Sequence, residues 1–289
     1  MFKNVLLLYK KSAYKIYFLD RKGFTKGANK KVIGEQLKKF KKAHEEHYQT
    51  LKTVTQVLIE EKIGFSEFFR GQRVNYDAYD LIITVGGDGT FLEAARHARS
   101  QIIIGVNSAP GFSTGSFCAA NRRNFRPLIR KILKQRYSVR FLERLRVKFD
   151  SIKTPFEALN DILICHENPA MMCRYILKIG RRSEEQRSSG LWVATPAGSS
   201  GAVLSAGGKL LDRSHKLFQY VPRELYPRHS KIYNFKGGII RPHRSFKVVS
   251  LMRGGLVYVD GAHVKVPFEY GESVSVTISP SPVRTVKVK

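Results

Sequence analysis

The chain reads Asp80-Leu81-Ile82-Ile83-Thr84-Val85 and passes directly into Gly86-Gly87-Asp88-Gly89-Thr90. The first run is apolar and partly β-branched, which predicts a buried strand, and residues 91–98 carry apolar side chains at helical spacing. A further apolar run, Ile102-Ile103-Ile104-Gly105-Val106, predicts the next strand. When a helix connects two strands in this way, the two strands lie parallel in one sheet. The stretch therefore predicts α/β architecture with a loop at the carboxyl edge of a parallel sheet.

The residues before this unit continue the α/β pattern, whereas those after it change in character. We expect a strand at Asn4 to Leu8 and a long amphipathic helix from Gly34 to Glu60. From about residue 139 the chain consists of short β-rich runs, such as Ser273-Val274-Ser275-Val276-Thr277-Ile278. We predict an α/β domain with a parallel sheet at residues 1–138 and a β-rich, sandwich-like domain at residues 139–289.

Length and composition predict a globular protein. The 289 residues, 43% of them hydrophobic, supply a core for one large domain or two ordinary ones. No run approaches the roughly 18 uninterrupted apolar residues of a membrane helix, and the start lacks the features of a signal peptide. Cys118, Cys165 and Cys173 show no CxxC pair or zinc spacing, which favours buried thiols in a reducing compartment. We expect a cytoplasmic protein without membrane insertion.

The net charge points to a polyanion without selecting one. The 51 Lys and Arg residues against 23 Asp and Glu residues give +28, far more than solubility requires. Nucleic acid is the obvious candidate, but the charge is spread along the chain. The cluster Lys38-Lys39-Phe40-Lys41-Lys42 lies in the predicted helix with its lysines on the solvent side. Phosphorylated small molecules or an anionic membrane surface would suit this charge as well.

The loop Gly86-Gly87-Asp88-Gly89-Thr90 has the composition of a phosphate site. Its glycines let the backbone turn sharply next to an anion, and the N–H groups at a helix start favour phosphate oxygens. Asp88 would repel phosphate, so it needs a role: deprotonating a hydroxyl group or holding magnesium. Both roles belong to phosphoryl transfer. The alternative is an ordinary turn in which Asp88 caps the helix. No GxxxxGK[ST] pattern is present, which excludes a P-loop enzyme.

Three further segments are candidates for binding. A loop at residues 105–116 follows the next strand, so it opens at the same sheet edge, although its Gly, Ser and Pro content is common in loops. Residues 188–208 carry small hydroxyl residues and glycines, which suit either ribose and phosphate binding or close helix packing. Asn160 and Asp161 open a strand and could bind a base or a ribose diol, although such a pair is often only a turn.

With these segments in this order, the chain resembles the NAD kinase family from about Asp80 to Gly208, and more loosely through Tyr258-Val259-Asp260-Gly261. The resemblance implies that Asp88 activates the 2′-hydroxyl of the adenosine ribose, with Gly86, Gly87, Gly89 and Thr90 shaping the phosphate loop. It further implies that the dinucleotide is bound by Asn160, Asp161, Ser189, Ser200, Gly201 and Ser205. ATP as the phosphoryl donor, Mg²⁺ and a homodimer or homotetramer are implied as well, while the metal-binding residues stay unassigned.

The chain departs from the common bacterial pattern at two places in the acceptor site. Ala202 stands where those members have an aromatic residue, and Ser189-Gly190 replaces their Asp-Gly. The segments Gly-Val-Asn-Ser, Ser-Ser-Gly-Leu and Val-Asp-Gly-Ala-His look more like the plant and organellar branch, in which NADH can be the preferred acceptor. The choice between NAD and NADH, and between ATP and polyphosphate as donor, therefore stays open.

Two alternative functions follow from the same residues. A lipid kinase of the diacylglycerol or sphingosine type would share the Gly86–Thr90 loop, and the basic charge would suit a membrane surface, but the 188–208 segment argues against it. A non-catalytic relative that binds nucleic acid or another polyanion would explain the +28 charge, but the retained Asp88 argues against lost chemistry. The leading prediction is a kinase that phosphorylates NAD or NADH to NADP(H).

Overall fold

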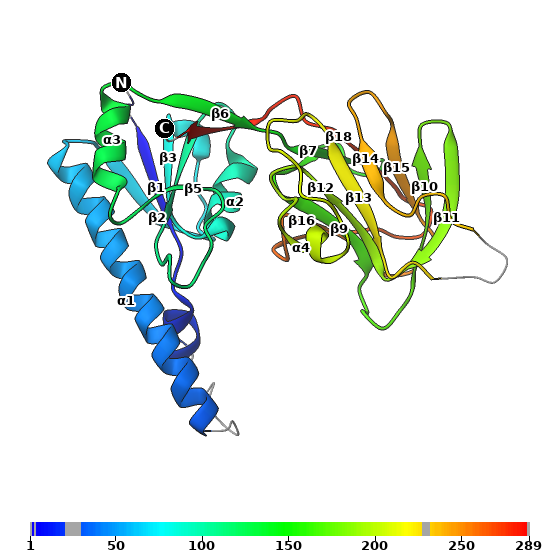
Figure 1. Ribbon diagram of the computed structural model, residues 1–289, viewed down its shortest axis with the longest axis horizontal. Helices are drawn as coiled ribbons and strands as arrows, with labels where there is room; N and C mark the ends of the chain where they lie inside the picture. The colour runs from blue at the N-terminus through cyan, green and yellow to red at the C-terminus, as the bar shows by residue number, and fades with distance from the viewer. Residues whose placement is uncertain (1, 3, 21–29, 227–231, 288–289) are drawn as a thin grey trace. The chain divides into compact units, whose positions relative to one another are not determined.

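The structure, a computed structural model, describes residues 2, 4–20, 30–226 and 232–287. The chain divides into two compact units: residues 1–140 together with 284–289, and residues 141–283 (Figure 1). The first unit is α/β and the second is β-rich, as the sequence predicts. The division differs from the predicted one because strand β19 (Val283–Lys287) belongs to the first sheet. The apolar pattern of a strand does not tell which of two sheets it joins.

The first unit is built on a seven-stranded sheet with the order β2-β1-β3-β4-β19-β6, and β5 pairs with β4. The pairings of β1 with β2 and β3, and of β4 with β3, β5 and β19, are parallel. The strands are β1 (Val5–Tyr9), β2 (Phe65–Phe69), β3 (Leu81–Gly86), β4 (Ile102–Asn107), β5 (Cys118–Asn121) and β6 (Ser138–Leu142). The helices are α1 (Lys30–Glu60), α2 (Asp88–His97) and α3 (Phe125–Leu133), with a π-helical turn at Lys15–Leu19 and a 3₁₀ turn at Tyr76–Ala78.

Helices cover both faces of this sheet. On one face α1 and α3 pack together, because their apolar stripes meet alternate residues of the central strands (Figure 1). This core contains Val5, Leu7, Val54, Val57, Leu58, Ile83, Ile104, Phe125 and Ile129. On the other face α2 lies against β3 and β4, where Phe91 stacks on Phe117 with ring centroids 5.3 Å apart. The helix predicted from Gly34 begins at Lys30.

The second unit is a sandwich of two six-stranded sheets, with the orders β11-β10-β15-β18-β7-β8 and β14-β13-β12-β9-β16-β17. The first sheet contains β7 (Leu145–Phe149), β8 (Phe156–Ala158), β10 (Cys173–Ile179), β11 (Arg182–Ser188), β15 (Phe246–Ser250) and β18 (Ser273–Ile278). The second contains β9 (Asp161–His166), β12 (Gly190–Ala194), β13 (Phe218–Arg223), β14 (Gly238–Ile240), β16 (Gly255–Val259) and β17 (Val264–Pro267). A short helix, α4 (Ala202–Ser205), follows β12.

Alternate residues of both sheets face a common apolar core, which explains the period-two pattern of these strands. In β10, for example, Cys173, Tyr175, Leu177 and Ile179 are buried while Arg174 and Lys178 are exposed. In the second sheet, β12 and β16 both pair with β9. Their register brings residues 159–161, 195 and 260 to one end of the sheet. None of the helices in the described part of the chain is long and apolar enough to cross a membrane.

Candidate functional site

The phosphate loop lies at the junction of β3 and α2. Gly86 ends the strand, Gly87 precedes the first helical residue, and Asp88 and Gly89 lie in the first turn. A Cβ atom at Gly86 would stand 2.2 Å from Thr90 Oγ1, so a side chain at this position would displace the buried Thr90. The loop therefore needs glycine where the strand turns into the helix. The structure brings the five predicted loop residues together at the carboxyl edge of the first sheet.

Asp88 does not cap its own helix. The residue in the capping position is Gly87, and no side chain caps the helix start. Instead Asp88 Oδ1 accepts a hydrogen bond of 2.9 Å from the backbone N–H of Phe117, which precedes β5. Oδ2 receives no hydrogen bond from the residues that the structure describes. The long-range bond holds the carboxylate at the strand ends and leaves one oxygen available.

The loop at residues 105–116 lies beside the phosphate loop, as the sequence predicts. Asn107 at the end of β4 organises it: Nδ2 donates to Ser113 O at 2.9 Å, and Oδ1 accepts from Ser113 Oγ at 2.9 Å. Ser108 N–H donates to Gly86 O at 2.9 Å, and Thr50 Oγ1 of α1 donates to Ser108 O at 2.9 Å. Ser113 Oγ is 3.4 Å from the position of a Cβ at Gly87, so the two loops are in contact.

Two cations that sequence reasoning missed lie at the same edge. Lys10 follows β1 and Arg70 follows β2, and these strands are neighbours in the sheet. Burial, and then the Asp88 carboxylate, raise the pKa of the Cys118 thiol to about 12, whereas the Lys10 charge opposes this rise. Asp88 and Lys10 therefore both lie near Cys118. In the sequence each cation is a single basic residue after a short strand, so only the pairing of the strands reveals them.

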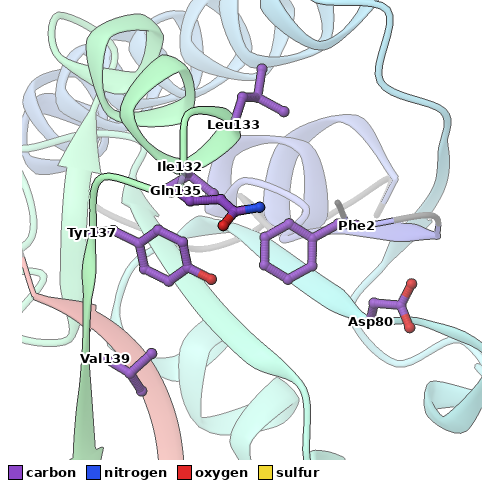
Figure 2. A pocket seen from close by; sticks show the side chains of 7 residues that line it. All are labelled: Phe2, Asp80, Ile132, Leu133, Gln135, Tyr137 and Val139. Atoms are coloured by element: carbon purple, nitrogen blue, oxygen red, sulfur yellow. The ribbon is translucent and has the colours of Figure 1, made fainter.

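A separate hollow of about 450 Å³ lies at the opposite edge of the same sheet. Figure 2 shows its lining, in which Phe2 and Asp80 come from the segments that lead into β1 and β3. Tyr137, Ile132 and Gln135 complete it from the end of α3 and the start of β6. Because Phe2 and Asp80 precede their strands while the phosphate loop follows its strand, the hollow is distinct from the phosphate site.

In the second unit, Asn160 and Asp161 are held by a third residue, Asp260. The Asp260 carboxylate accepts from the N–H groups of Leu159 at 2.9 Å, Asn160 at 2.7 Å and Asp161 at 3.3 Å. Asn160 Nδ2 in turn donates to Asp161 Oδ2 at 2.7 Å. Asp260 follows β16 and sits in the left-handed region at φ 49. The family resemblance extends to the motif around Asp260, but no pattern in the sequence indicates the contact of Asp260 with residues 159–161.

Asp161 is an unusual carboxyl group. It is 5% exposed, and burial raises its pKa to about 7, with the nearby Asp260 carboxylate adding to the rise and the Asn160 amide opposing it. Arg144 is also buried, and its positive charge faces Asp260. Near neutral pH, Asp161 can therefore either donate or accept a hydrogen bond.

The turn after β12 lies directly against this pair. Thr195 Oγ1 donates to Leu159 O at 2.6 Å and accepts from Gly198 N–H at 3.0 Å. A Cβ at Gly198 would stand 2.1 Å from Asn160 O, so only glycine fits there. The Gly201 Cβ position is 3.4 Å from Asn160 Nδ2 and 3.8 Å from Asp161 Oδ2. The structure thus brings Asn160, Asp161 and Gly201 together.

The predicted serines fall in different places. Ser200 is exposed next to Gly201, and Ser205 is exposed at the end of α4, one helical turn further along. Ser189 lies at the other end of β12, where its N–H donates to Arg223 O at 2.9 Å. Within this unit Ser189 is therefore separated from the Asn160 group by the length of the five-residue strand. Strand length and direction decide this placement, and spacing in the sequence alone did not reveal it.

Comparison with known proteins identifies the two units. The ATP-NAD kinase N-terminal domain model matches residues 11–137, and the ATP-NAD kinase C-terminal domain model matches residues 159–288. A probable NADH kinase of Oryza sativa subsp. japonica is 33% identical over 83% of this chain and 81% of its own length. An NAD kinase of Methanoregula boonei is 30% identical over 75% of this chain and 78% of its own length.

Solved structures show the same fold. An NAD kinase from Archaeoglobus fulgidus in complex with ATP superposes with a TM-score of 0.72 at 21% identity, covering 98% of this chain and 93% of that one. Yeast NADH kinase complexed with NADH superposes with a TM-score of 0.69 at 15% identity, covering 99% of this chain and 84% of that one. With both domain models matched along the chain and a plant NADH kinase among its relatives, this protein belongs to the NAD kinase family.

Proposed function

We propose that the protein transfers the terminal phosphoryl group of ATP to the 2′-hydroxyl of the adenosine ribose of NAD or NADH. The single observation that carries this proposal is the position of Asp88. Its carboxylate is held at the carboxyl edge of the parallel sheet by Phe117 N–H, next to the helix start that favours phosphate oxygens. A carboxylate among phosphate-binding groups is expected in phosphoryl transfer, where the acceptor hydroxyl must lose its proton.

In this mechanism Asp88 Oδ2 accepts the proton of the 2′-hydroxyl while the hydroxyl oxygen bonds to the terminal phosphorus atom. The bond from that phosphorus to the bridging oxygen breaks, and ADP leaves. The backbone N–H groups at the start of α2 stabilise the charge on the transferred phosphoryl group. Because the loop glycines and the Asn107 network hold these groups in place before the reaction, positioning supplies much of the catalysis.

Magnesium fits this loop as a partner of the phosphates. Among the described residues no group of three or more His, Cys, Asp and Glu side chains could hold a metal ion. Mg²⁺ usually binds through one or two carboxylates, with phosphates and waters as its other ligands. Because Asp88 Oδ2 is assigned to the acceptor proton, a bound Mg²⁺ would be held mainly by the donor phosphates and waters. A bound Mg²⁺ would neutralise charge on the donor phosphates.

The second unit supplies the dinucleotide-binding residues in this proposal. Asn160 and Asp161 are preorganised by Asp260, and the lack of a side chain at Gly201 leaves room beside Asn160 Nδ2 and Asp161 Oδ2. The exposed hydroxyls of Ser200 and Ser205 lie on the same turn and short helix and are proposed to bind the ribose and adenine. Ser189, at the far end of β12, would contact a different part of the dinucleotide.

The test is an assay of NADP(H) formation by the full chain, with NAD and NADH as acceptors and ATP and polyphosphate as donors. We expect product with ATP and Mg²⁺ and with at least one acceptor, and the ratio of the two kcat/KM values would identify the preferred redox state. Absence of product with every pair, together with ATP-dependent phosphorylation of lipid vesicles, would favour the lipid kinase alternative. Size-exclusion chromatography with light scattering tests the proposed homodimer or homotetramer.

A further inference from the structure

Three neighbouring strands of the first sheet end side by side, and each is followed by a residue of the phosphate edge. Tyr9 of β1 pairs with Phe69 of β2 and with Val85 of β3. The next residues in register are therefore Lys10, Arg70 and Gly86. Backbone hydrogen bonds fix this arrangement: Arg70 N–H donates to Tyr9 O at 2.7 Å, and Lys10 N–H donates to Val85 O at 3.3 Å.

The Arg70 side chain reaches the phosphate loop itself. Its Nη1 atom is 3.0 Å from the position that a Cβ at Gly89 would occupy, so the guanidinium lies on the first turn of α2. Arg70 Nε is 3.8 Å from Glu93 Oε2, and Arg96 Nη1 is 3.4 Å from the same oxygen. One carboxylate thus faces two guanidinium groups, which leaves a net positive charge beside the loop.

Lys10 is half-buried and forms no ion pair with the residues that the structure describes. Its pKa is lowered, chiefly by burial and then by the Arg70 charge. Partial burial of an ammonium group without a counter-ion is unfavourable. Packing alone therefore does not explain the lysine, whereas an anion bound at this edge would.

The adjacent residue, Lys11, has a different environment. Its Nζ lies 4.3 Å from the centroid of the Phe69 ring and 4.0 Å from Asp20 Oδ2. Lys11 thus has partners within its own unit, whereas Lys10 lies near Cys118 and forms no ion pair with the described residues. The two neighbouring lysines form a natural matched pair for an experiment.

We propose that Lys10 and Arg70 form a two-cation clamp that binds the terminal phosphates of the nucleoside triphosphate donor at the Gly86–Thr90 loop. The inference rests on the proposed function, in which the first unit takes the donor. The clamp draws the phosphates toward the start of α2 and compensates for the negative charge that Asp88 places there. Both residues are binding residues, and neither takes part in proton transfer.

The experiment is isothermal titration calorimetry of the full chain with adenosine, AMP, ADP and ATP in excess Mg²⁺. We compare the wild type with Lys10→Met, Arg70→Met and the control Lys11→Met. A lost charge-assisted hydrogen bond weakens binding by about 10- to 100-fold, so Lys10→Met and Arg70→Met should weaken ATP binding by that factor. AMP and adenosine binding should change less than about twofold, and Lys11→Met should change none of the four.

The ligand series separates binding from folding damage. A loss of the same size for AMP and ATP, or an unchanged ATP affinity in Lys10→Met, would overturn the clamp. Lys10→Arg should restore most of the ATP affinity, because it returns the charge. Titration with NAD distinguishes donor from acceptor phosphates: we expect unchanged NAD affinity, and a selective loss of NAD binding would also overturn the proposal.

The same variants keep this inference distinct from the proposed function. In the NADP(H) assay, Lys10→Met should raise the KM for ATP much more than it lowers kcat. If the wild type binds ATP in a Lys10-dependent manner but forms no NADP(H), the clamp stands and the proposed acceptor is wrong. If NADP(H) forms with an unchanged KM for ATP in Lys10→Met, the proposed function stands and the clamp is wrong.

Discussion

Asp88 in the first unit and Asp161 in the second are both candidate site residues, but they lie in opposite surroundings. Asp88 is half-exposed, accepts one backbone N–H and has the cations Lys10 and Arg70 on the neighbouring strand ends. Asp161 is buried beside a second carboxylate, Asp260. Burial and the like charge of Asp260 both favour the protonated form of Asp161. In the proposed function, one residue type would therefore accept a proton in the first unit and take part in preorganised binding in the second.

The strongest test of this contrast is the substitution Asp88→Asn. It removes the proton acceptor but retains the shape and the bond to Phe117 N–H. Removing a general base typically costs about 10²- to 10⁴-fold in rate, and we expect kcat to fall by that factor with NAD affinity retained. Steady-state kinetics and calorimetry check the two parts. The matched control is Asp77→Asn, an exposed residue of the same unit whose carboxylate lies 3.7 Å from Arg99. A near-normal rate in Asp88→Asn would remove Asp88 from the mechanism.

The next test concerns the protonation of Asp161. Its pKa is raised from 3.8 to about 7, so folding favours the protonated form. This contribution to stability is complete when the pH is below the pKa of 3.8 in the unfolded chain, and it is lost as the pH rises through the folded-state pKa of about 7. The free energy of unfolding of the wild type, minus that of Asp161→Asn, should fall with pH by up to about 1.4 kcal/mol per unit.

Urea unfolding between pH 5 and pH 8 measures this slope. The control is Asp150→Asn, because hydrogen bonds from Ser273 and Lys247 lower the pKa of Asp150 and place its titration below this range. Asp260 and Arg144 are the charged groups that face Asp161 and its partner, and both are retained in the two variants. A pH-independent difference would show that the pKa of Asp161 is not raised by folding, and the contrast between the two units would disappear.

The smallest expected effect belongs to Asp260, which supports the site without forming it. In the wild type, the Asp260 carboxylate accepts hydrogen bonds from the backbone N–H groups of Leu159 and Asn160. In Asp260→Asn, one of the two accepting oxygens is replaced by an NH₂ group, which donates and cannot accept. We expect the free energy of unfolding to fall by about 1–3 kcal/mol, because a buried donor loses its partner. Asp212→Asn is the control, since the exposed Asp212 also accepts a backbone N–H, from Ser214, and should cost about 0.5 kcal/mol or less. Equal losses would mean that Asp260 has no special role in holding residues 159–161.

The sequence predicted the architecture because local periodicity carries it. The strand that ends in Gly86, the helix that begins at Asp88 and the alternating strands of the second unit are each legible within about ten residues. The parallel first sheet and the β-rich second unit are confirmed. Contacts between residues that are far apart in the sequence could not be predicted from it. The bond from Asp260 to Asn160 spans 100 residues, and the proximity of Lys10 to Arg70 depends on the pairing of β1 with β2.

The candidate site was predicted in part for the same reason. Gly86 to Thr90 are consecutive residues of one loop, so predicting the position of one of them also predicts the positions of the others. Asn160, Asp161 and Gly201 meet because β9 and β12 are antiparallel neighbours. The family resemblance implied that these residues share a binding site, but neither it nor the spacing gave the strand pairing. Ser189 precedes β12 and Gly201 follows it, so the two residues lie at opposite ends of the strand. The assignment of roles to these residues stays a prediction until the variants are measured.

The return of β19 to the first sheet has a consequence for synthesis on the ribosome. Thr285 pairs with Ile103 of β4, and its Oγ1 donates to Ile103 O at 2.8 Å. The sheet order places β19 between β4 and β6, although the chain passes through all of residues 141–283 before it returns. At about 5–20 residues per second, the first sheet waits roughly 7–30 s for its missing strand while the sandwich is translated. The start of β4 in the nascent unit, where Ile102 and Ile103 later pair with β19, thus has an unpaired edge during that interval, the kind of edge that favours aggregation.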